Sequence, residues 1–332
     1  MCLYPRLILN RKYKANAKNG GIIPAIPDMR VRYVPVGCQV CIECKKQKAR
    51  QWQVRLSEEI KNNRNGRFIT LTFSTAGLRE VYESDDKLKD LSGYDLDNGI
   101  CTRAVRLFLE RWRKKYKVSL RHWFITELGH GETEHVHLHG IVWTDDLYEI
   151  ERIWKYGFVW KGKLVRNTLV NYVNEKTVNY IIKYVTKIDE EHLNFFGKVL
   201  CSPGIGKDFI NSGNDYRNRF KGSETDEGYR LPSGRKVNMP IYYRNKLYSE
   251  KEKELLWLDR LDKNIRFVCG CKVDMNSEEG VKAYYNMVDY YRRKSIDLGY
   301  PSPDFIYSNK AYEELRRKLI HEKRLFDKPP TP

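Results

Sequence analysis

The chain has 332 residues, of which 41% are hydrophobic and 13% aromatic, and 61 Lys and Arg against 43 Asp and Glu give a formal net charge of +18. The aromatic content excludes a disordered chain, and charges that interrupt every apolar stretch exclude a membrane span of about 20 residues. The first residues turn basic too early for a secretory signal, so we expect a cytoplasmic protein. Eight cysteines are too sparse for a disulfide scaffold and predict free thiols or metal ligands.

The positive charge is concentrated near the start of the chain. Residues 1–60 contain 12 basic and 4 acidic residues, which is nearly half of the net charge in less than a fifth of the length. A basic segment of this kind is typical of proteins that bind a polyanion, most often nucleic acid. We therefore expect a basic N-terminal arm and helix over residues 1–60.

Apolar spacing and turn residues predict the elements of the first half. The segment 1–37 is basic and rich in turn residues, which predicts loops. Helical spacing predicts a helix over about 44–62, and alternation predicts a strand over 67–73. The acidic stretch 80–99 is expected to be an exposed connection. A helical stripe that includes Phe108 and Trp112 predicts a helix that ends near Tyr116.

The second half begins with two strands, 122–128 and 135–144, which Gly129, His130 and Gly131 are expected to join as a hairpin. Helical patterns follow at 174–188, 247–261, 281–296 and 312–325.

This order of elements predicts an α+β fold with an antiparallel central sheet, flanking helices and a mainly helical C-terminal region. We expect a catalytic core over 61–245 and a separate region over 246–332.

Three histidines occur at alternate positions in the second of these strands. Side chains alternate across a strand, so His135, His137 and His139 are expected on one face while Val136 and Leu138 point to a core. Neutral imidazoles at this spacing are natural ligands for a divalent ion. Glu127 on the neighbouring strand is the nearest carboxylate that could complete the set. A polar strand face without a ligand is the alternative.

The predicted helix over 174–188 carries a second group of reactive side chains. Residues at i, i+4 and i+7 share a helix face, which places Tyr180, Tyr184 and Lys187 together with Lys183 beside them. Lysines near a phenol are expected to lower its pKa from about 10 and to offset charge on a phosphate. Such a helix could equally be an ordinary exposed face. Together with the histidines, it indicates metal-assisted transesterification of nucleic acid.

These features resemble a known superfamily, the HUH endonucleases that initiate rolling-circle replication. The resemblance rests on His137-Leu138-His139, on the Tyr-x-x-Lys-Tyr-x-x-Lys helix and on the strand 68–73. The chain is most similar to replication initiation proteins of single-stranded DNA microviruses, particularly the gokushovirus branch. That similarity covers roughly residues 31–245 and includes the segments 38–45, 107–114, 153–157, 202–206 and 239–243. Val136 stands where proline commonly precedes the histidine pair, and His135 is additional.

The resemblance implies that His137, His139 and Glu127 bind Mg²⁺ or Mn²⁺, with His135 as an alternative ligand. It implies that Tyr180 or Tyr184 attacks a phosphodiester of the origin to leave a 5′-phosphotyrosyl linkage and a free 3′-hydroxyl. Lys183 and Lys187 would stabilise the phosphate charge. The partners it implies are single-stranded DNA at the viral replication origin and the host's helicase and polymerase, in the cytoplasm of a bacterial cell and away from membranes.

Two other functions fit parts of the sequence. The alternation His135, His137, His139 also occurs in histidine-triad nucleotide hydrolases, in which His137 would be a metal-independent nucleophile. A noncatalytic protein that binds or packages single-stranded DNA would explain the charge and the aromatic residues. The first alternative leaves the tyrosine–lysine helix unexplained, and the second leaves the histidines unexplained.

Cys38, Cys41 and Cys44 form a Cys-x-x-Cys-x-x-Cys cluster. This spacing lets thiolates converge on one ion, so the cluster is a candidate structural Zn²⁺ site, with Cys201 or one of Cys269 and Cys271 as a fourth ligand. An iron–sulfur cluster and a set of reduced thiols without metal are the alternatives.

Overall fold

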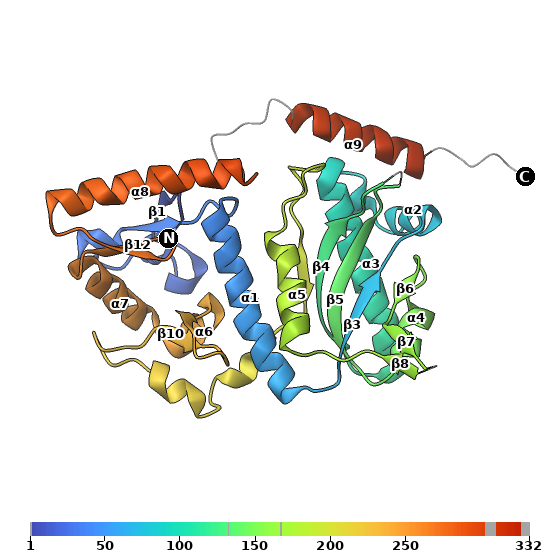
Figure 1. Ribbon diagram of the computed structural model, residues 1–332, viewed down its shortest axis with the longest axis horizontal. Coiled ribbons are helices and arrows are strands. Elements are labelled where there is room, and N and C mark those ends of the chain that lie inside the picture. Colours follow the sequence, from blue (N-terminus) through green and yellow to red (C-terminus); the bar gives the residue numbers. More distant parts are fainter. Residues whose placement is uncertain (1, 132, 167, 303–309, 327–332) are drawn as a thin grey trace, which may run out of the picture. The chain divides into compact units, whose positions relative to one another are not determined.

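A computed structural model describes residues 2–131, 133–166, 168–302 and 310–326. The chain divides into two compact units, each made of two separate segments (Figure 1). The first unit comprises Met1–Val54 and Lys207–Phe305, and the second comprises Arg55–Gly206 and Ile306–Pro332. Helix α1 (Ile42–Asn62) contributes residues to both units. None of the described helices combines the length and apolar character needed to cross a membrane.

The second unit is built on a five-stranded antiparallel sheet with the strand order β6-β3-β5-β4-β9. The two central strands, β4 and β5, form the hairpin that the sequence predicts. The strands of this unit are β3 (Gly66–Leu71), β4 (Arg121–Leu128), β5 (Val136–Trp143), β6 (Val159–Trp160) and β9 (Val199–Cys201), and the small pair β7 (Lys163–Val165) and β8 (Thr168–Val170).

Helices cover both faces of this sheet (Figure 1). The main hydrophobic core lies between one face and the helices α2, α3 and α4, whose apolar residues pack with Leu138 and Val142 of β5. Helix α5 lies on the opposite face, and Leu325 of α9 completes the main core. The helices of the unit are α2 (Thr75–Glu83), α3 (Gly93–Tyr116), α4 (Leu147–Ile153), α5 (Glu175–Thr186) and α9 (Lys310–Leu325).

Alternation along β5 separates core residues from candidate site residues. Val136, Leu138 and Val142 are completely buried in the main core, so His137 and His139 point to the face that α5 covers. Gly140 allows β4 to approach closely, because a Cβ at this position would lie 2.1 Å from Cδ1 of Phe124, its cross-strand neighbour. The hairpin therefore presents the histidines on a rigid surface.

Helix α5 forms because its sequence satisfies both its N-terminus and its buried face. Asn174 caps the helix, and its side chain and that of Thr177 make the reciprocal bonds of a capping box. Val178, Ile181, Ile182 and Val185 recur at helical spacing and are buried. Tyr180 and Lys183 are exposed on the other side of the helix.

The first unit consists of small sheets and helices around separate clusters of apolar residues. Its two-stranded sheets are β1 (Arg6–Leu9) with β2 (Tyr33–Val36), β10 (Gly228–Arg230) with β11 (Lys236–Asn238), and β12 (Ile265–Val268) with β13 (Cys271–Asp274). Its other helices are α6 (Ile241–Leu247), α7 (Glu250–Asp262) and α8 (Glu278–Asp297). Short 3-10 helices occur at Arg11–Tyr13, Ala17–Asn19, Met29–Val31, Asp86–Leu88, Lys207–Phe209 and Asn214–Asn218, of which only Asp86–Leu88 belongs to the second unit.

The predicted α+β fold class and antiparallel sheet are confirmed. Two local predictions are wrong. The acidic stretch 80–99 is not an exposed connection, because it contains the end of α2 and the start of α3, and Leu88, Leu96 and Asp97 in it are buried. The segment 1–37 is not purely loop, because β1 pairs with β2.

Candidate active site

Three side chains from the central hairpin converge on the face that α5 covers. The strand register places Glu127 of β4 directly opposite His137 of β5. Oε2 of Glu127 lies 3.1 Å from Nε2 of His137 and 2.7 Å from Nε2 of His139. One atom from each of the three residues lies within 4.8 Å of the others, so these donors surround a common point. The sequence-predicted ligand set is therefore brought together by strand alternation and hairpin register.

The hydrogen bonds of the imidazoles prepare their Nε2 atoms for a cation. Nδ1 of His137 lies 3.4 Å from the carbonyl oxygen of His135, and a carbonyl only accepts, so Nδ1 donates there. A neutral ring then presents the lone pair of Nε2 toward Oε2 of Glu127, which is also an acceptor. Nδ1 of His139 contacts the hydroxyl of Thr70 at 3.0 Å. A set of two imidazole nitrogens and one carboxylate oxygen fits a divalent ion such as Mn²⁺ or Mg²⁺.

The protonation preferences of the site agree with that donor set. Burial lowers the pKa of His139, which favours the neutral ring that a metal ligand requires. Burial opposes ionisation of Glu127, but its neighbours His137, His139 and Lys187 hold the pKa of this carboxyl well below its usual range. The site thus holds a carboxylate and at least one neutral imidazole at neutral pH.

The two tyrosines of α5 lie against this donor set. The ring of Tyr184 stacks on His139 with 4.4 Å between ring centroids, and the hydroxyls of Tyr180 and Tyr184 are 2.7 Å apart. Phe68 of β3 contacts Tyr180 edge to face at 5.8 Å. Helical spacing therefore places both phenols beside the histidines, as the sequence predicts.

The expectation of a lowered phenol pKa is wrong for Tyr184. Burial, the hydrogen bond with Tyr180 and the negative charge of Glu127 all raise the pKa of Tyr184. The physical reason is that Lys187, which the sequence places near the phenols, makes its ion pair with Glu127. Tyr184 is therefore protonated at neutral pH in the absence of a bound cation.

The two lysines of the helix have different surroundings. Lys187, the C-cap residue of α5, pairs with Oε1 of Glu127 and so contacts the carboxylate from the side away from the histidines' shared oxygen. Lys183 is exposed, and its ammonium makes no hydrogen bond or ion pair with the residues that the structure describes. Lys187 thus orients Glu127, whereas Lys183 faces solvent.

His135 lies near the site but makes other contacts. Its Nδ1 donates to the carbonyl oxygen of Phe73 at 2.9 Å, and its Nε2 is 3.3 Å from the hydroxyl of Thr75. It precedes β5 and is not part of the group of donor atoms around Glu127. The two histidines within the strand, rather than the additional one, face the carboxylate.

A groove of about 840 Å³ opens beside the histidines and tyrosines. His139 and Tyr180 line one part of it, and Phe158, Trp160, Tyr172 and Lys176 line the rest. Phe158 and Tyr172 are each 64% exposed, so their rings are available for stacking. Aromatic rings interleaved with ammonium groups are the features that proteins use to bind single-stranded nucleic acid.

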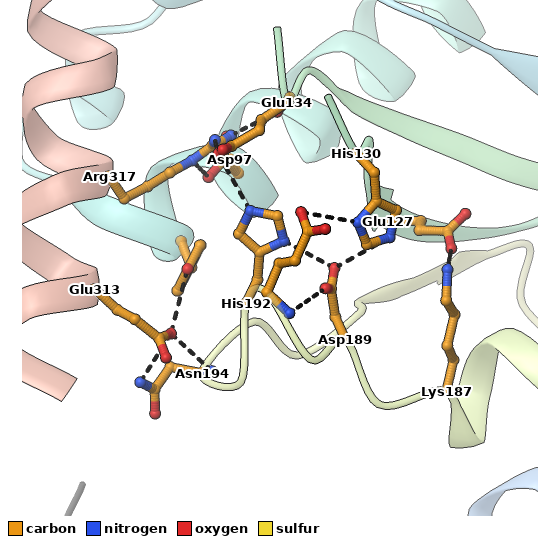
Figure 2. Close-up of polar contacts among 12 residues, drawn as sticks. Asp97, Glu127, His130, Glu134, Lys187, Asp189, His192, Asn194, Glu313 and Arg317 are labelled. Atoms are coloured by element: carbon orange, nitrogen blue, oxygen red, sulfur yellow. Dashed lines mark hydrogen bonds and ion pairs between the residues drawn. The ribbon is translucent and has the colours of Figure 1, made fainter. Parts of the chain in front are cut away.

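A network of charged residues supports the chain on either side of the site (Figure 2). Arg317 of α9 makes a two-point ion pair with buried Asp97 of α3, at 2.7 and 2.8 Å, and also contacts Glu134. Glu134, in the connection between β4 and β5, lies 3.1 Å from Nε2 of His192, whose Nδ1 lies 2.9 Å from Asp189 just beyond α5. The connection of the hairpin and the end of α5 are therefore tied to α3 and α9.

The cysteine cluster of the first unit is a separate group. The structure brings together Cys38, Cys41 and Cys44, as the sequence predicts, and adds Cys2, so that the four Sγ atoms lie within 4.8 Å of one another. Cys201, Cys269 and Cys271 are not part of this group. The suggested fourth ligands are thus replaced by a residue near the N-terminus.

Sequence reasoning missed three contributors. Thr70 and Phe68 lie on the strand face that contacts His139, and their alternation in the strand 67–73 was the available signal. Cys2 is 36 residues from Cys38, and no local pattern joins them. Only the folded hairpin of β1 and β2 brings the N-terminal residues to the cluster.

Comparison with known proteins gives one match. Residues 66–189 match the family model described as Replication-associated protein ORF2. This range runs from the start of β3 to just beyond α5 and so contains Glu127, both histidines, both tyrosines and both lysines. No curated protein and no solved structure matches the chain. The match supports a relationship to replication initiators of the rolling-circle type for the sheet and α5.

Proposed function

We propose that this protein is a rolling-circle replication initiator that nicks single-stranded origin DNA by tyrosine attack and later rejoins the strand. The observation that carries the proposal is the contact between two kinds of group. Tyr184 stacks on His139, which is itself one of the three converging donors with His137 and Glu127. A nucleophile next to a cation site, in a segment that matches replication-associated proteins, fits phosphodiester transfer.

The chain's own residues would hold the metal and fix its surroundings. His137, His139 and Glu127 offer the nitrogen and oxygen donors, and Lys187 orients the carboxylate through its second oxygen. A bound Mg²⁺ or Mn²⁺ would supply Lewis-acid polarisation and a fixed position for the scissile phosphate. Thr70 holds the ring of His139 through Nδ1 and so leaves Nε2 directed at the site.

The proposed step exchanges one phosphate ester for another. The hydroxyl oxygen of a tyrosine bonds to phosphorus, the bond between phosphorus and the 3′-oxygen breaks, and the phenolic proton leaves while the 3′-oxygen gains one. The products are a 5′-phosphotyrosyl linkage and a free 3′-hydroxyl, so no high-energy cofactor is consumed. Lys183 and Lys187 would offset charge on the phosphate as it reacts.

The geometry favours Tyr184 for the first attack. Its ring contacts His139, whereas Tyr180 contacts Phe68 and lines the neighbouring groove. Tyr180 reaches the same position through the hydroxyl of Tyr184, 2.7 Å away. The second tyrosine could therefore attack a regenerated origin after synthesis, while the first still holds the 5′ end.

The groove gives the DNA strand a path to the tyrosines. Bases would stack on Phe158, Trp160 and Tyr172 while Lys176 follows the phosphates, which brings a phosphodiester to His139 and Tyr180. The free 3′-hydroxyl must then be extended by a polymerase on an unwound template. We therefore extend the proposal to a viral origin, the host helicase and polymerase, and the cytoplasm of a bacterial host.

The test uses 3′-labelled single-stranded oligonucleotides that together tile the genome encoding the chain, incubated with the purified protein and Mn²⁺. We expect one sequence to give a labelled covalent adduct on a denaturing gel. The double substitution Tyr180→Phe and Tyr184→Phe should abolish the adduct, and Tyr148→Phe, an exposed tyrosine outside α5, should not. An adduct that survives the double substitution contradicts the proposal.

The same reactions separate the two alternatives. A histidine-triad hydrolase would keep its activity in EDTA and would lose it on substitution of His137, whereas the proposed nicking stops in EDTA and returns with Mn²⁺. A packaging protein would retain the oligonucleotides on a filter but would form no adduct with any of them. Retention without an adduct across the whole set contradicts the proposed chemistry.

A further inference from the structure

A second cluster of reactive side chains lies in the first unit, outside the region that matches the replication-associated family. We propose that Cys2, Cys38, Cys41 and Cys44 bind a single Zn²⁺ ion as four thiolates and that this ion stabilises the first unit. The proposal is independent of the nicking activity, because none of the four residues belongs to the candidate active site.

The separations of the sulfur atoms match the size of one tetrahedral ion. Sγ of Cys2 lies 3.9 Å from Sγ of Cys41, and Sγ of Cys38 lies 4.0 Å from Sγ of Cys44. Zinc–sulfur bonds of about 2.3 Å in a tetrahedron place neighbouring sulfurs about 3.8 Å apart. Two independent pairs therefore have the required spacing, and all four atoms lie within 4.8 Å of one another.

The backbone around the cluster is shaped to bring the thiols together. Gln39, between Cys38 and Cys41, has a φ of 69°, so the chain turns back on itself within the first Cys-x-x-Cys. Gly37 leaves room for the last thiol, because a Cβ at this position would lie 2.9 Å from Sγ of Cys44. These features keep the segment compact enough for three sulfurs to face one point.

Backbone amides and a helix terminus favour sulfur in its ionised form. The amides of Tyr4 and Cys38 each donate to Sγ of Cys2 at 3.2 Å, and the amide of Cys41 donates to Sγ of Cys38 at 3.3 Å. Cys41 directly precedes α1, and Cys44 lies in its first turn, where the helix dipole stabilises negative charge. Amide donors and positive dipoles around the sulfurs are typical of thiolate metal sites.

The position of the cluster suggests what the ion would do. Cys41 and Cys44 are buried with Leu3, Val268 and Val288 in a small core that joins the N-terminal residues to β12 and α8. A core this small supplies little hydrophobic stabilisation, and a structural metal is one of the devices that compensate. A cavity of about 560 Å³ lined by Cys2 and Cys44 gives the ion a route in.

The geometry distinguishes zinc from the other occupants. A cluster of several irons would hold its ligands around a larger body, so its sulfurs would stand farther apart than 3.9 and 4.0 Å. All four cysteines are free thiols in the structure, and four sulfurs around one point exceed what a single disulfide uses. One ion with four ligands accounts for the whole group.

The test measures metal in the full-length protein purified without chelator. We expect one zinc per chain by elemental analysis, and X-ray absorption at the zinc edge should show four sulfur neighbours at about 2.3 Å. The substitution Cys2→Ser should lower the zinc content and remove the fourth sulfur. Cys271→Ser alters an exposed cysteine outside the cluster and should leave one zinc per chain.

Three results would overturn the proposal. These are a wild-type protein without stoichiometric zinc after refolding with Zn²⁺, stoichiometric iron and sulfide in its place, and an absorption spectrum with nitrogen or oxygen ligands. If Cys2→Ser does not fold, the spectrum of the wild-type protein still decides the ligand set. None of these measurements depends on nicking, so failure of the proposed function leaves them unaffected.

Discussion

The two candidate metal sites of this protein contrast in donor chemistry and in access. Glu127, His137 and His139 offer one oxygen and two nitrogens beside an open groove, and reactive phenols lie within contact. The cysteine cluster offers four sulfurs that saturate a tetrahedral ion. Open sites with mixed donors are typical of catalysis, whereas closed thiolate sites are typical of structure. The comparison teaches that the two groups should fail in different ways when they are perturbed.

The largest effect should follow loss of the closed site. The substitution Cys44→Ser should lower the free energy of unfolding by about 4 kcal/mol or more, a size characteristic of losing a bound metal. Chemical denaturation of the wild-type and variant proteins would measure this. Cys101→Ser is a poor control because Cys101 is buried in the other core, so Cys271→Ser serves instead. An unchanged midpoint for Cys44→Ser contradicts a structural role.

A comparable effect on activity, without an effect on zinc, should follow from the open site. His139→Ala should slow adduct formation by about 10²–10³-fold, the range found when one charge-stabilising group is removed from a reaction site. Zinc content and the unfolding of the first unit should stay at their wild-type values. Adduct yield against time in Mn²⁺ gives the rate. A variant that loses both zinc and activity would erase the distinction between the sites.

A smaller effect is expected from the residue that orients the carboxylate. Lys187→Ala removes the partner of Glu127 and should weaken Mn²⁺ dependence and rate by about 10–100-fold, as second contacts of metal ligands typically do. The half-saturating Mn²⁺ concentration for nicking is the measurement. Lys155→Ala, an exposed lysine in the same unit, removes the same charge and should change little. Equal effects of the two variants would reduce Lys187 to a general contribution to the field.

The smallest effect concerns the residues that tie the end of α5 to the hairpin. Burial opposes protonation of His192, but Asp189 and Glu134 raise its pKa above the ordinary 6.5. A raised folded-state pKa stabilises the fold fully below pH 6.5, and this contribution is lost as the pH rises through the folded-state value. Unfolding free energies measured across that window should fall for the wild-type protein and fall less for His192→Gln. Parallel curves for the two proteins would contradict the assignment.

Much of the open site could be predicted from the sequence because its determinants are local. Alternate histidines share a strand face, tyrosines four residues apart share a helix face, and a hairpin sets the register that brings Glu127 to His137. The pairing of Lys187 could not be predicted in this way. It depends on where α5 ends relative to β4, and it reverses the expected effect on the pKa of Tyr184.

The features that were missed depend on contacts between distant segments. The stretch 80–99 looks exposed because it is acidic, but Asp97 is neutralised by Arg317, 220 residues away. Cys2 joins its cluster across 39 residues, through the pairing of β1 with β2. Its position also means that deleting residues 1–30 would remove a zinc ligand together with basic charge. Charge-neutralising substitutions are therefore the cleaner test of DNA binding by the N-terminal arm.

The measurement that tests the central claim most directly is the identity of the residue that carries the DNA. The covalent adduct can be isolated, digested with nuclease and protease, and mapped by mass spectrometry. We predict a nucleotide 5′-phosphate attached to the hydroxyl oxygen of Tyr184, and of Tyr180 when Tyr184 is replaced by phenylalanine. Attachment to His137, or to any residue outside α5, would contradict the account.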